Sequence, residues 1–260
     1  MGIDDYVADT LPVNEPYAGL VAEAYDVWMP PTTTDPDVAG WRAAIVDGDG
    51  PALELGCGNG RLLVGLRRDG LDVEGVDASA DMLAICAQHA AAAGVELGLH
   101  HADWTTMQLG RTYATIYNPA GSFVLMHDEA DARRALANWR GHLRPGGRLY
   151  VSMGVPAAAK RDANYEWRLR RSGTRARDGM TFMVHEALRF DDGAQLQHAL
   201  HRHEVWAADG TLVTTFVRRH LQHWWTRPQL EAALRDAGLV GVESRGSETS
   251  FVTIGSAPAH

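Results

Sequence analysis

Cysteine and long apolar runs are both scarce in this chain. Only two cysteines, Cys57 and Cys86, occur among its 260 residues, which excludes the disulfide framework of a small secreted domain. No run of about 18 apolar residues is present to span a membrane. The first residues are acidic and lack the apolar segment of a secretory signal. We therefore expect a soluble protein in a reducing compartment, the cytoplasm.

Basic charge is also in short supply. The chain has 24 Lys and Arg against 33 Asp and Glu, a formal net charge of −9, and no run of basic residues. Binding to nucleic acid depends on neutralising many phosphates with Lys and Arg. The composition therefore argues against a nucleic-acid partner and favours a small-molecule substrate.

Two common nucleotide-binding motifs are absent as well. The dinucleotide motif G-x-G-x-x-G would need a third glycine where the chain has Arg61, and no lysine follows the glycines as a phosphate loop requires. Instead, an apolar strand ends near Glu54 and is followed by Gly56-Cys57-Gly58-Asn59-Gly60. Alternating glycines permit a sharp turn and a close approach of the backbone to a ligand. A helix beginning at 59–61 would point free N–H groups at that ligand. The alternative interpretation is a tight turn that binds nothing.

The residues that follow favour the ligand-binding interpretation. Residues 71–77 read as a second strand that ends in Asp77, about 20 positions after the glycines, where α/β nucleotide sites place a carboxylate for the ribose hydroxyls. Ser79 is a suitable N-cap for a following helix. A third strand over 95–101 leads into Asp103-Trp104.

Strands and helices then continue to alternate. Residues 111–118 are expected to form a fourth strand, and a Pro145-Gly146-Gly147 turn leads into a fifth over 148–151. Helical runs at 61–69, 80–93 and 129–143 separate the strands. Such alternation predicts a parallel sheet with helices on both faces.

The two ends of the chain complete this pattern. Thr226 and Pro228 signal the start of a helix that ends at 236–238. The last two strands, 240–244 and 250–255, are expected as an antiparallel hairpin at the sheet edge. Near the N-terminus, residues 17–28 read as a helix that stops before Pro30.

A long insertion separates the fifth strand from the last helix. Within residues 154–225, three alternating runs at 181–190, 196–206 and 212–225 are divided by turn residues, which predicts a three-stranded antiparallel meander. Ligands of doubly wound folds bind beyond the carboxyl ends of the strands. The insertion leaves from such an end, so we expect it to cover the site as a substrate cap.

The insertion is chemically distinct from the rest of the chain. It holds six of the twelve histidines and four of the eight tryptophans, with eleven Lys and Arg against eight Asp and Glu. One interpretation is a pocket for an anionic or aromatic substrate, and the other is a solvated basic sheet face. His201 and His203 share a strand face while His198 points to the other. No metal site is expected, because cysteine and carboxylate partners are lacking.

In order and spacing, these motifs resemble the class I S-adenosylmethionine-dependent methyltransferases. The resemblance implies S-adenosylmethionine as cofactor and S-adenosylhomocysteine as product. It also implies that Asp77 binds the ribose, Asp103 the adenine amino group, and Trp104 the adenine ring. The cofactor-binding residues expected from it are Tyr17, Tyr25, Glu54, Gly56, Cys57, Gly58, Gly60, Arg61, Asp77, Ala78, Met82, Asp103, Trp104 and Asn118.

Segments 76–83, 121–123 and 144–147, together with the insertion, are similar to glycine N-methyltransferase and to the aminosugar N,N-dimethyltransferases. In those enzymes a tyrosine of the N-terminal helix reaches the cofactor, and this implies such a role for Tyr25, with Tyr17 second. Gly121 stands where glycine N-methyltransferase has asparagine, which argues against glycine as substrate.

Three residues are candidates for catalysis. The aminosugar enzymes can carry a histidine near the position of Leu125, which leaves His127 as a displaced candidate base or, alternatively, a helix cap before Asp128. His185 and Tyr25 are the other two candidates.

The sequence therefore predicts a Rossmann-like, doubly wound, mostly parallel seven-stranded sheet with a meander inserted after strand 5. The expected parts are a helical lid (1–40), a cofactor-binding core (41–153), a substrate cap (154–225) and the closing helix and strands (226–260). We expect methyl transfer to nitrogen or oxygen of a small molecule by a monomer or homodimer. A cofactor-binding protein without turnover, or an enzyme of elimination or decarboxylation, are the alternatives.

Overall fold

The computed structural model describes residues 11–31, 36–157 and 166–259, so the acidic N-terminal residues considered above lie outside it. The chain divides into two compact units, a large unit (Pro30–Val155 and Trp225–His260) and a small unit (Met1–Met29 and Pro156–Trp224). None of the helices within the described ranges is long and apolar enough to cross a membrane.

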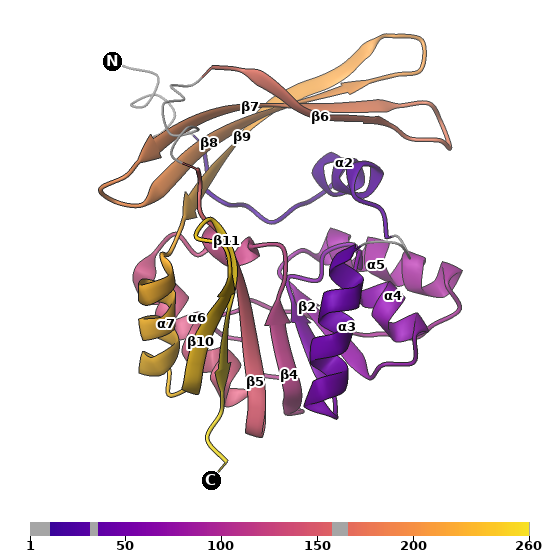
Figure 1. Ribbon diagram of the computed structural model, residues 1–260. Helices are drawn as coiled ribbons and strands as arrows, with labels where there is room; N and C mark the ends of the chain where they lie inside the picture. Colours follow the sequence, from indigo (N-terminus) through magenta and orange to yellow (C-terminus); the bar gives the residue numbers. More distant parts are fainter. Residues whose placement is uncertain (1–10, 32–35, 158–165, 260) are drawn as a thin grey trace. The chain divides into compact units, whose positions relative to one another are not determined.

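The large unit is built on a seven-stranded sheet (Figure 1) with the order β10-β11-β5-β4-β1-β2-β3. Its strands are β1 (Ala52–Leu55), β2 (Val73–Asp77), β3 (Gly98–His101), β4 (Tyr113–Asn118), β5 (Leu143–Gly154), β10 (Val240–Gly246) and β11 (Ser250–Ser256). β1 is parallel to both β2 and β4, whereas β11 is antiparallel to β5 and β10. The predicted fold class is confirmed.

Burial follows strand position in this sheet. All four residues of β1 and all six of β4 are buried, as expected for central strands with both faces covered by helices. In Figure 1, α3 (Pro36–Gly48), α4 (Leu63–Arg68) and α5 (Ala80–Ala92) lie on one side of the strands, and α6 (Glu129–Gly141) and α7 (Arg227–Asp236) on the other. A short 3₁₀ helix, η1 (Ser122–Leu125), follows β4.

Side-chain caps fix where three of these helices begin. Ser79 accepts a hydrogen bond from the Met82 N–H at 3.0 Å and starts α5, as predicted. Thr226 and Gln229 form a capping box at the start of α7, with Pro228 inside the first turn. At α6 the cap is Asp128, which accepts from the Asp131 N–H at 2.9 Å. The cap expected of His127 is therefore wrong: an Asp carboxylate reaches a first-turn N–H across a short side chain.

The large unit differs from the prediction in three further ways. Helix α3 was not predicted, because its sequence contains Gly40 and Gly48 and shows no clear apolar periodicity. α4 begins at Leu63, two residues beyond the predicted start. Residues 145–147 lie within β5 rather than before it, at a register irregularity beside β4. Gly147 is required there, since an added Cβ would lie 2.8 Å from the Tyr113 carbonyl oxygen.

The small unit is a four-stranded antiparallel sheet with the order β6-β7-β8-β9. It comprises β6 (Arg168–Thr174), β7 (Thr181–Asp191), β8 (Leu196–Trp206) and β9 (Leu212–His223). The last three are the predicted meander. The first is an addition that the sequence did not reveal, because β6 is almost entirely exposed and lacks alternation.

Helix α2 (Leu20–Trp28) packs on this four-stranded sheet. Its buried Ala24 forms a small apolar cluster with Phe182 and Val205. The helix begins three residues later than predicted because Gly19, with φ of 52°, breaks the backbone ahead of it, and Tyr17 therefore precedes the helix.

Gly60 and Gly65 form a matched pair for a test of packing. Gly60 has φ of 82°, and an added Cβ would lie 2.7 Å from Cys86 Sγ, whereas a Cβ at Gly65 in α4 meets nothing within 4 Å. We expect Gly60→Ala to destabilise the protein by about 1–3 kcal/mol. Gly65→Ala should be neutral or stabilise it by up to about 1 kcal/mol, because alanine favours the helix. Urea unfolding measures both, and equal effects at the two positions would contradict this account of the turn.

Candidate functional site

The central feature of the large unit is the edge at which its parallel strands end. Leu55 pairs with Val76 and Asp77 with His101, so the turn after β1, the end of β2 and the end of β3 lie side by side. On the other side of β1, Glu54 pairs with Tyr117, next to Asn118. β1 lies between β2 and β4 in the sheet. After β1 the chain therefore builds the sheet first toward β2 on one side and later toward β4 on the other side. Such a switch point is where open α/β sheets bind ligands.

The glycine turn requires its glycines. Gly56, Gly58 and Gly60 have φ values of 72°, 56° and 82°, in the left-handed region that other residues rarely adopt. A Cβ at Gly56 would lie 2.9 Å from Cζ2 of Trp104, and one at Gly58 would lie 3.1 Å from Cε of Met82. The turn therefore presents bare backbone, with Trp104 and Met82 packed directly against it.

Asp77 joins this turn to the next one. Its Oδ2 accepts from the Gly58 N–H at 2.9 Å, and its Oδ1 accepts from the Ser79 N–H at 2.8 Å. Burial raises the pKa of the Asp77 carboxyl, against the opposing effect of these two N–H groups. A carboxylate held in this way has lone pairs left for the hydroxyl groups of a ligand.

Glu54 is the most deeply buried carboxyl at this edge, with 2% of its surface exposed. It accepts from the Tyr117 hydroxyl at 2.9 Å. Burial is the main cause that raises the pKa of Glu54 to about 8, and the Tyr117 hydrogen bond and Arg61 oppose it. Tyr117 was missed from the sequence. Tyr117 lies opposite Glu54 in the neighbouring strand. This pairing can be recognised only when the register of β1 and β4 is known.

The two cysteines lie together behind the turn. Cys57 and Cys86 are both free and buried. A hydrogen bond with Cys86, followed by burial, raises the pKa of the Cys57 thiol. A thiol that stays protonated is a poor nucleophile, and the expected contact of Cys57 with a cofactor stays a prediction.

Asp103 and Asn118 are engaged in local structure. Asp103 Oδ1 accepts from the Thr105 N–H at 2.7 Å, which caps the turn after β3. Asn118 is fully buried; it donates to the Leu55 carbonyl at 3.2 Å and accepts from the Phe123 N–H at 3.0 Å. Asn118 thus ties the end of β4 to the end of β1, and its expected contact with a cofactor stays a prediction.

Three other predicted residues surround the same edge. Trp104 packs edge-on against Trp139, with ring centroids 5.5 Å apart. Arg61 pairs with Asp37 of α3 at 3.3 Å. Ala78 is exposed, between Asp77 and the Ser79 cap.

The remaining candidates are placed elsewhere along the chain. Tyr17 and Tyr25 belong to the small unit, where their rings lie 5.6 Å apart. His185 is on β7 of the same unit, 3.7 Å from the Glu204 carboxylate. His127 lies in the large unit, immediately before the Asp128 cap. The catalytic roles of Tyr25, His127 and His185 stay predictions.

The small unit gathers histidines on one face of its sheet. His201 and His203 of β8 are joined by His220 of β9, and all three are buried. His201 and His220 have ring centroids 4.5 Å apart. Among the described residues no group of three or more His, Cys, Asp or Glu is placed to hold a metal ion.

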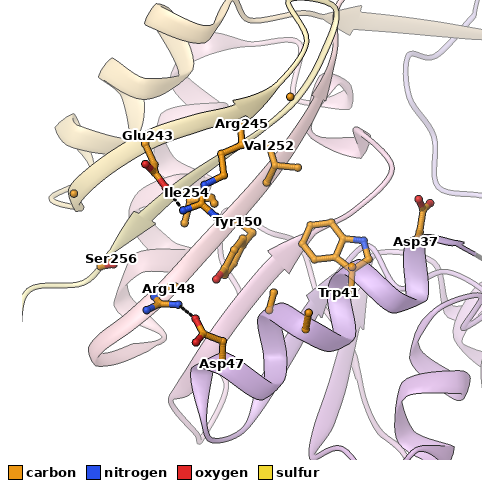
Figure 2. A pocket seen from close by; sticks show the side chains of 15 residues that line it. Asp37, Trp41, Asp47, Arg148, Tyr150, Glu243, Arg245, Val252, Ile254 and Ser256 are labelled. Carbon is orange, nitrogen blue, oxygen red and sulfur yellow. Dashed lines mark hydrogen bonds and ion pairs between the residues drawn. The ribbon is translucent and has the colours of Figure 1, made fainter.

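The large unit also has a cavity of about 930 Å³ between α3 and the strands β5, β10 and β11. Figure 2 shows Trp41 and Tyr150 facing this space, with ion pairs between Arg148 and Asp47 and between Arg245 and Glu243 at its border. None of the predicted cofactor residues lines it. The cavity is therefore separate from the strand edge that carries those residues.

The sheet order gives the large unit a Rossmann-like fold, and its glycine turn lies at the edge where such folds bind nucleotide-type cofactors. Residues 52–147 match the family model of a methyltransferase domain. The matched region runs from β1 into β5, and it contains the glycine turn, Asp77 and Asp103. This match covers less than half of the chain, and it is this region of the large unit that is similar to methyltransferases.

Two curated relatives match parts of the chain. One is the ubiquinone biosynthesis O-methyltransferase of Cronobacter sakazakii, 29% identical over 38% of this chain and 40% of that protein. The other is the dTDP-3-amino-3,6-dideoxy-alpha-D-glucopyranose N,N-dimethyltransferase of Streptomyces fradiae, 31% identical over 52% of this chain and 53% of that protein. The aligned regions thus span about half or less of each relative.

A solved structure extends the similarity of fold over both units. The S-adenosylmethionine-bound amino pentose methyltransferase CalS10 of Micromonospora echinaspora, involved in calicheamicin biosynthesis, has a TM-score of 0.65 with this chain. The match covers 94% of this chain and 99% of that protein at 22% identity. At this identity the similarity concerns the fold.

The buried Glu54 gives a testable dependence of stability on pH. With its pKa raised from 4.5 to about 8, folded Glu54 keeps a proton that the unfolded chain releases. Stability is therefore expected to fall as pH rises between these two values, by on the order of 1–3 kcal/mol. Glu54→Gln removes the titrating group and should therefore remove this fall in stability. Urea unfolding at several pH values measures the free energy of unfolding of both proteins.

The matched control is Glu96→Gln, because Glu96 is exposed. It should leave the pH dependence of the parent unchanged. An identical pH dependence in Glu54→Gln and the parent would show that Glu54 is ionised in the folded protein.

Proposed function

We propose that this protein transfers the methyl group of S-adenosylmethionine to a nitrogen or oxygen atom of a small-molecule acceptor and releases S-adenosylhomocysteine. The observation that carries this proposal is the strand edge, where Asp77 accepts from Gly58 in a turn of three positive-φ glycines, within the region that matches a methyltransferase domain.

The residues at this edge fit the cofactor. Bare backbone at Gly56 and Gly58 allows its close approach, and a Cβ at either position would meet Trp104 or Met82. Asp77 would bind the ribose hydroxyls. Trp104 would pack on the adenine ring and Asp103 would bind the adenine amino group. Glu54 offers a buried carboxyl for a cationic part of the cofactor, since a nearby positive charge favours the ionised carboxylate.

When bound, S-adenosylmethionine supplies a methyl group already activated by its sulfonium. The protein then has to hold the acceptor atom in line with that methyl group, exclude water and remove a proton where the acceptor carries one. A neutral amine needs little help from a base, whereas a hydroxyl needs a base. His127, His185 and Tyr25 are our candidates for the residue that removes this proton.

Nitrogen is our preferred acceptor atom. The Streptomyces fradiae relative acts on an amino group of a nucleotide-linked sugar, and CalS10 is an amino pentose methyltransferase. The Cronobacter sakazakii relative methylates oxygen, so oxygen is the second candidate. We assign acceptor recognition to residues 154–225, which lie outside the methyltransferase domain. The alternatives without methyl transfer are not favoured by these relatives.

Methyl transfer can be tested with cofactor carrying a labelled methyl group. We expect label to pass to an acceptor in a panel of aminosugars and their nucleotide-linked forms, with an equal amount of S-adenosylhomocysteine formed. Hydroxyl-only analogues of the same sugars distinguish nitrogen from oxygen. Cofactor turnover without labelled acceptor would support elimination or decarboxylation instead.

Asp77 tests the cofactor site independently of the acceptor. Calorimetry should show that Asp77→Ala weakens S-adenosylmethionine binding by about tenfold or more, because hydrogen bonds to a charged group contribute about 1.5–3 kcal/mol. Asp81→Ala is the matched control, since Asp81 is an exposed acid four residues further along and should leave the affinity unchanged. Equal affinity in Asp77→Ala and the parent would remove Asp77 from the site.

A further inference from the structure

One face of the four-stranded sheet carries a cluster of basic side chains, Arg170, His201, His203, Arg218 and His220, which we call the basic face. His201 pairs with Arg218 in the β8–β9 register, and His220 lies two residues beyond Arg218 on the same side of β9. His203 stacks on Phe216 with ring centroids 5.0 Å apart. All of these residues belong to the small unit.

Arg218 is buried, and within the described residues no carboxylate forms an ion pair with it, although the charge of Glu15 acts on it from further away. The exposed fraction of Arg218 is 9%. Nη2 donates to the backbone carbonyls of Glu15 and Pro16, and the guanidinium lies 5.3 Å from the centroid of the Tyr17 ring. Nη1 is buried and has no hydrogen-bond partner. Backbone carbonyls and an aromatic ring do not neutralise the charge of a buried guanidinium. The Nη1 donor of Arg218 is therefore available to a negatively charged ligand.

His220 provides a second unused polar atom. It is 3% exposed, and its Nε2 is buried without a partner. Neighbouring His201 is neutral, because its Nε2 lies 3.1 Å from Arg170 Nη1 and can only accept from that donor. Burial, with the charge of Arg218 next, lowers the pKa of His220 to about 4.

The charge of the basic face is therefore positive and only partly balanced. Arg170 has a carboxylate neighbour, Glu186 of β7, at 3.3 Å. Arg218 has none within ion-pair distance among the described residues. An anion brought to Arg218 would gain a charge-assisted hydrogen bond in a site of low dielectric, where such bonds are strongest.

We propose that the basic face is a binding site for an oxyanion, a phosphate or carboxylate group of a small-molecule ligand, which accepts hydrogen bonds from Arg218 Nη1 and His220 Nε2. The planar guanidinium suits such a group. Neutral His220 can donate this hydrogen bond in the tautomer that carries its proton on Nε2. Tyr17 lies beside both donors, with its ring 5.3 Å from the Arg218 guanidinium and 6.3 Å from the His220 ring.

The test uses the full-length protein without S-adenosylmethionine, so its outcome does not depend on methyl transfer. Inorganic phosphate, pyrophosphate and acetate are titrated separately by calorimetry at constant ionic strength. We expect saturable binding of at least one of them. Binding of phosphate or pyrophosphate alone identifies a phosphate group as the ligand, and binding of acetate alone identifies a carboxylate.

Variants locate the site. Arg218→Met should weaken binding by about tenfold or more while the melting temperature without anion stays the same or rises, because replacing an unpaired buried charge by an apolar side chain is often neutral or stabilising. His220→Phe should weaken binding by several-fold. Arg219→Met is the matched control, since Arg219 is the next residue on β9 and points to the opposite face; it should bind the anion as the parent does.

Two results would overturn the proposal. One is that none of the three anions binds the parent protein. The other is that an anion binds Arg218→Met and His220→Phe as tightly as the parent, which would place it elsewhere on the chain.

Discussion

The parallel pairing of β1 with β2 and β4 is the constraint on which the rest of the large unit depends. Because these strands run in one direction, their carboxyl ends lie at the same edge of the sheet. The glycine turn, Asp77 and Asn118 each follow or end one of these strands. Without the pairing they would be separated by tens of residues with no reason to meet, and helices α4 and α5 could not begin beside the same site.

Burial at this edge also sets the chemistry of its acids. Glu54 and Asp77 are both held with raised pKa values because the packed strands remove water around them. A nearby positive charge or hydrogen-bond donor favours the ionised form of a carboxyl buried in this way. In the small unit the pKa shifts have the opposite direction, because the buried groups there are basic. There burial lowers the pKa of Arg218 and of the histidines around it, and the group that would relieve this strain is an anion.

Local signals made much of this structure predictable. The glycine turn, the Ser79 cap and the helix start at Thr226 each depend on a few neighbouring residues, and all three appear as expected. Features without a local signal were missed. Strand β6 is exposed and does not alternate, α3 contains glycines, and the Tyr117–Glu54 hydrogen bond joins residues that are adjacent only through sheet register. His127 and Asp128 were confused because both are polar residues at the start of one helix.

The sequence by itself determined the strand–turn–helix order, the glycine turn and the acids that follow it, and hence the class of cofactor. These properties arise from backbone conformation and residue spacing, which are encoded over short distances. Only the tertiary structure decided which carboxyl is buried against Tyr117, which residues pack on the glycines, and which face of β8 and β9 gathers Arg218 and His220. Those outcomes depend on strand register and burial, and both are set by contacts between residues far apart in the chain.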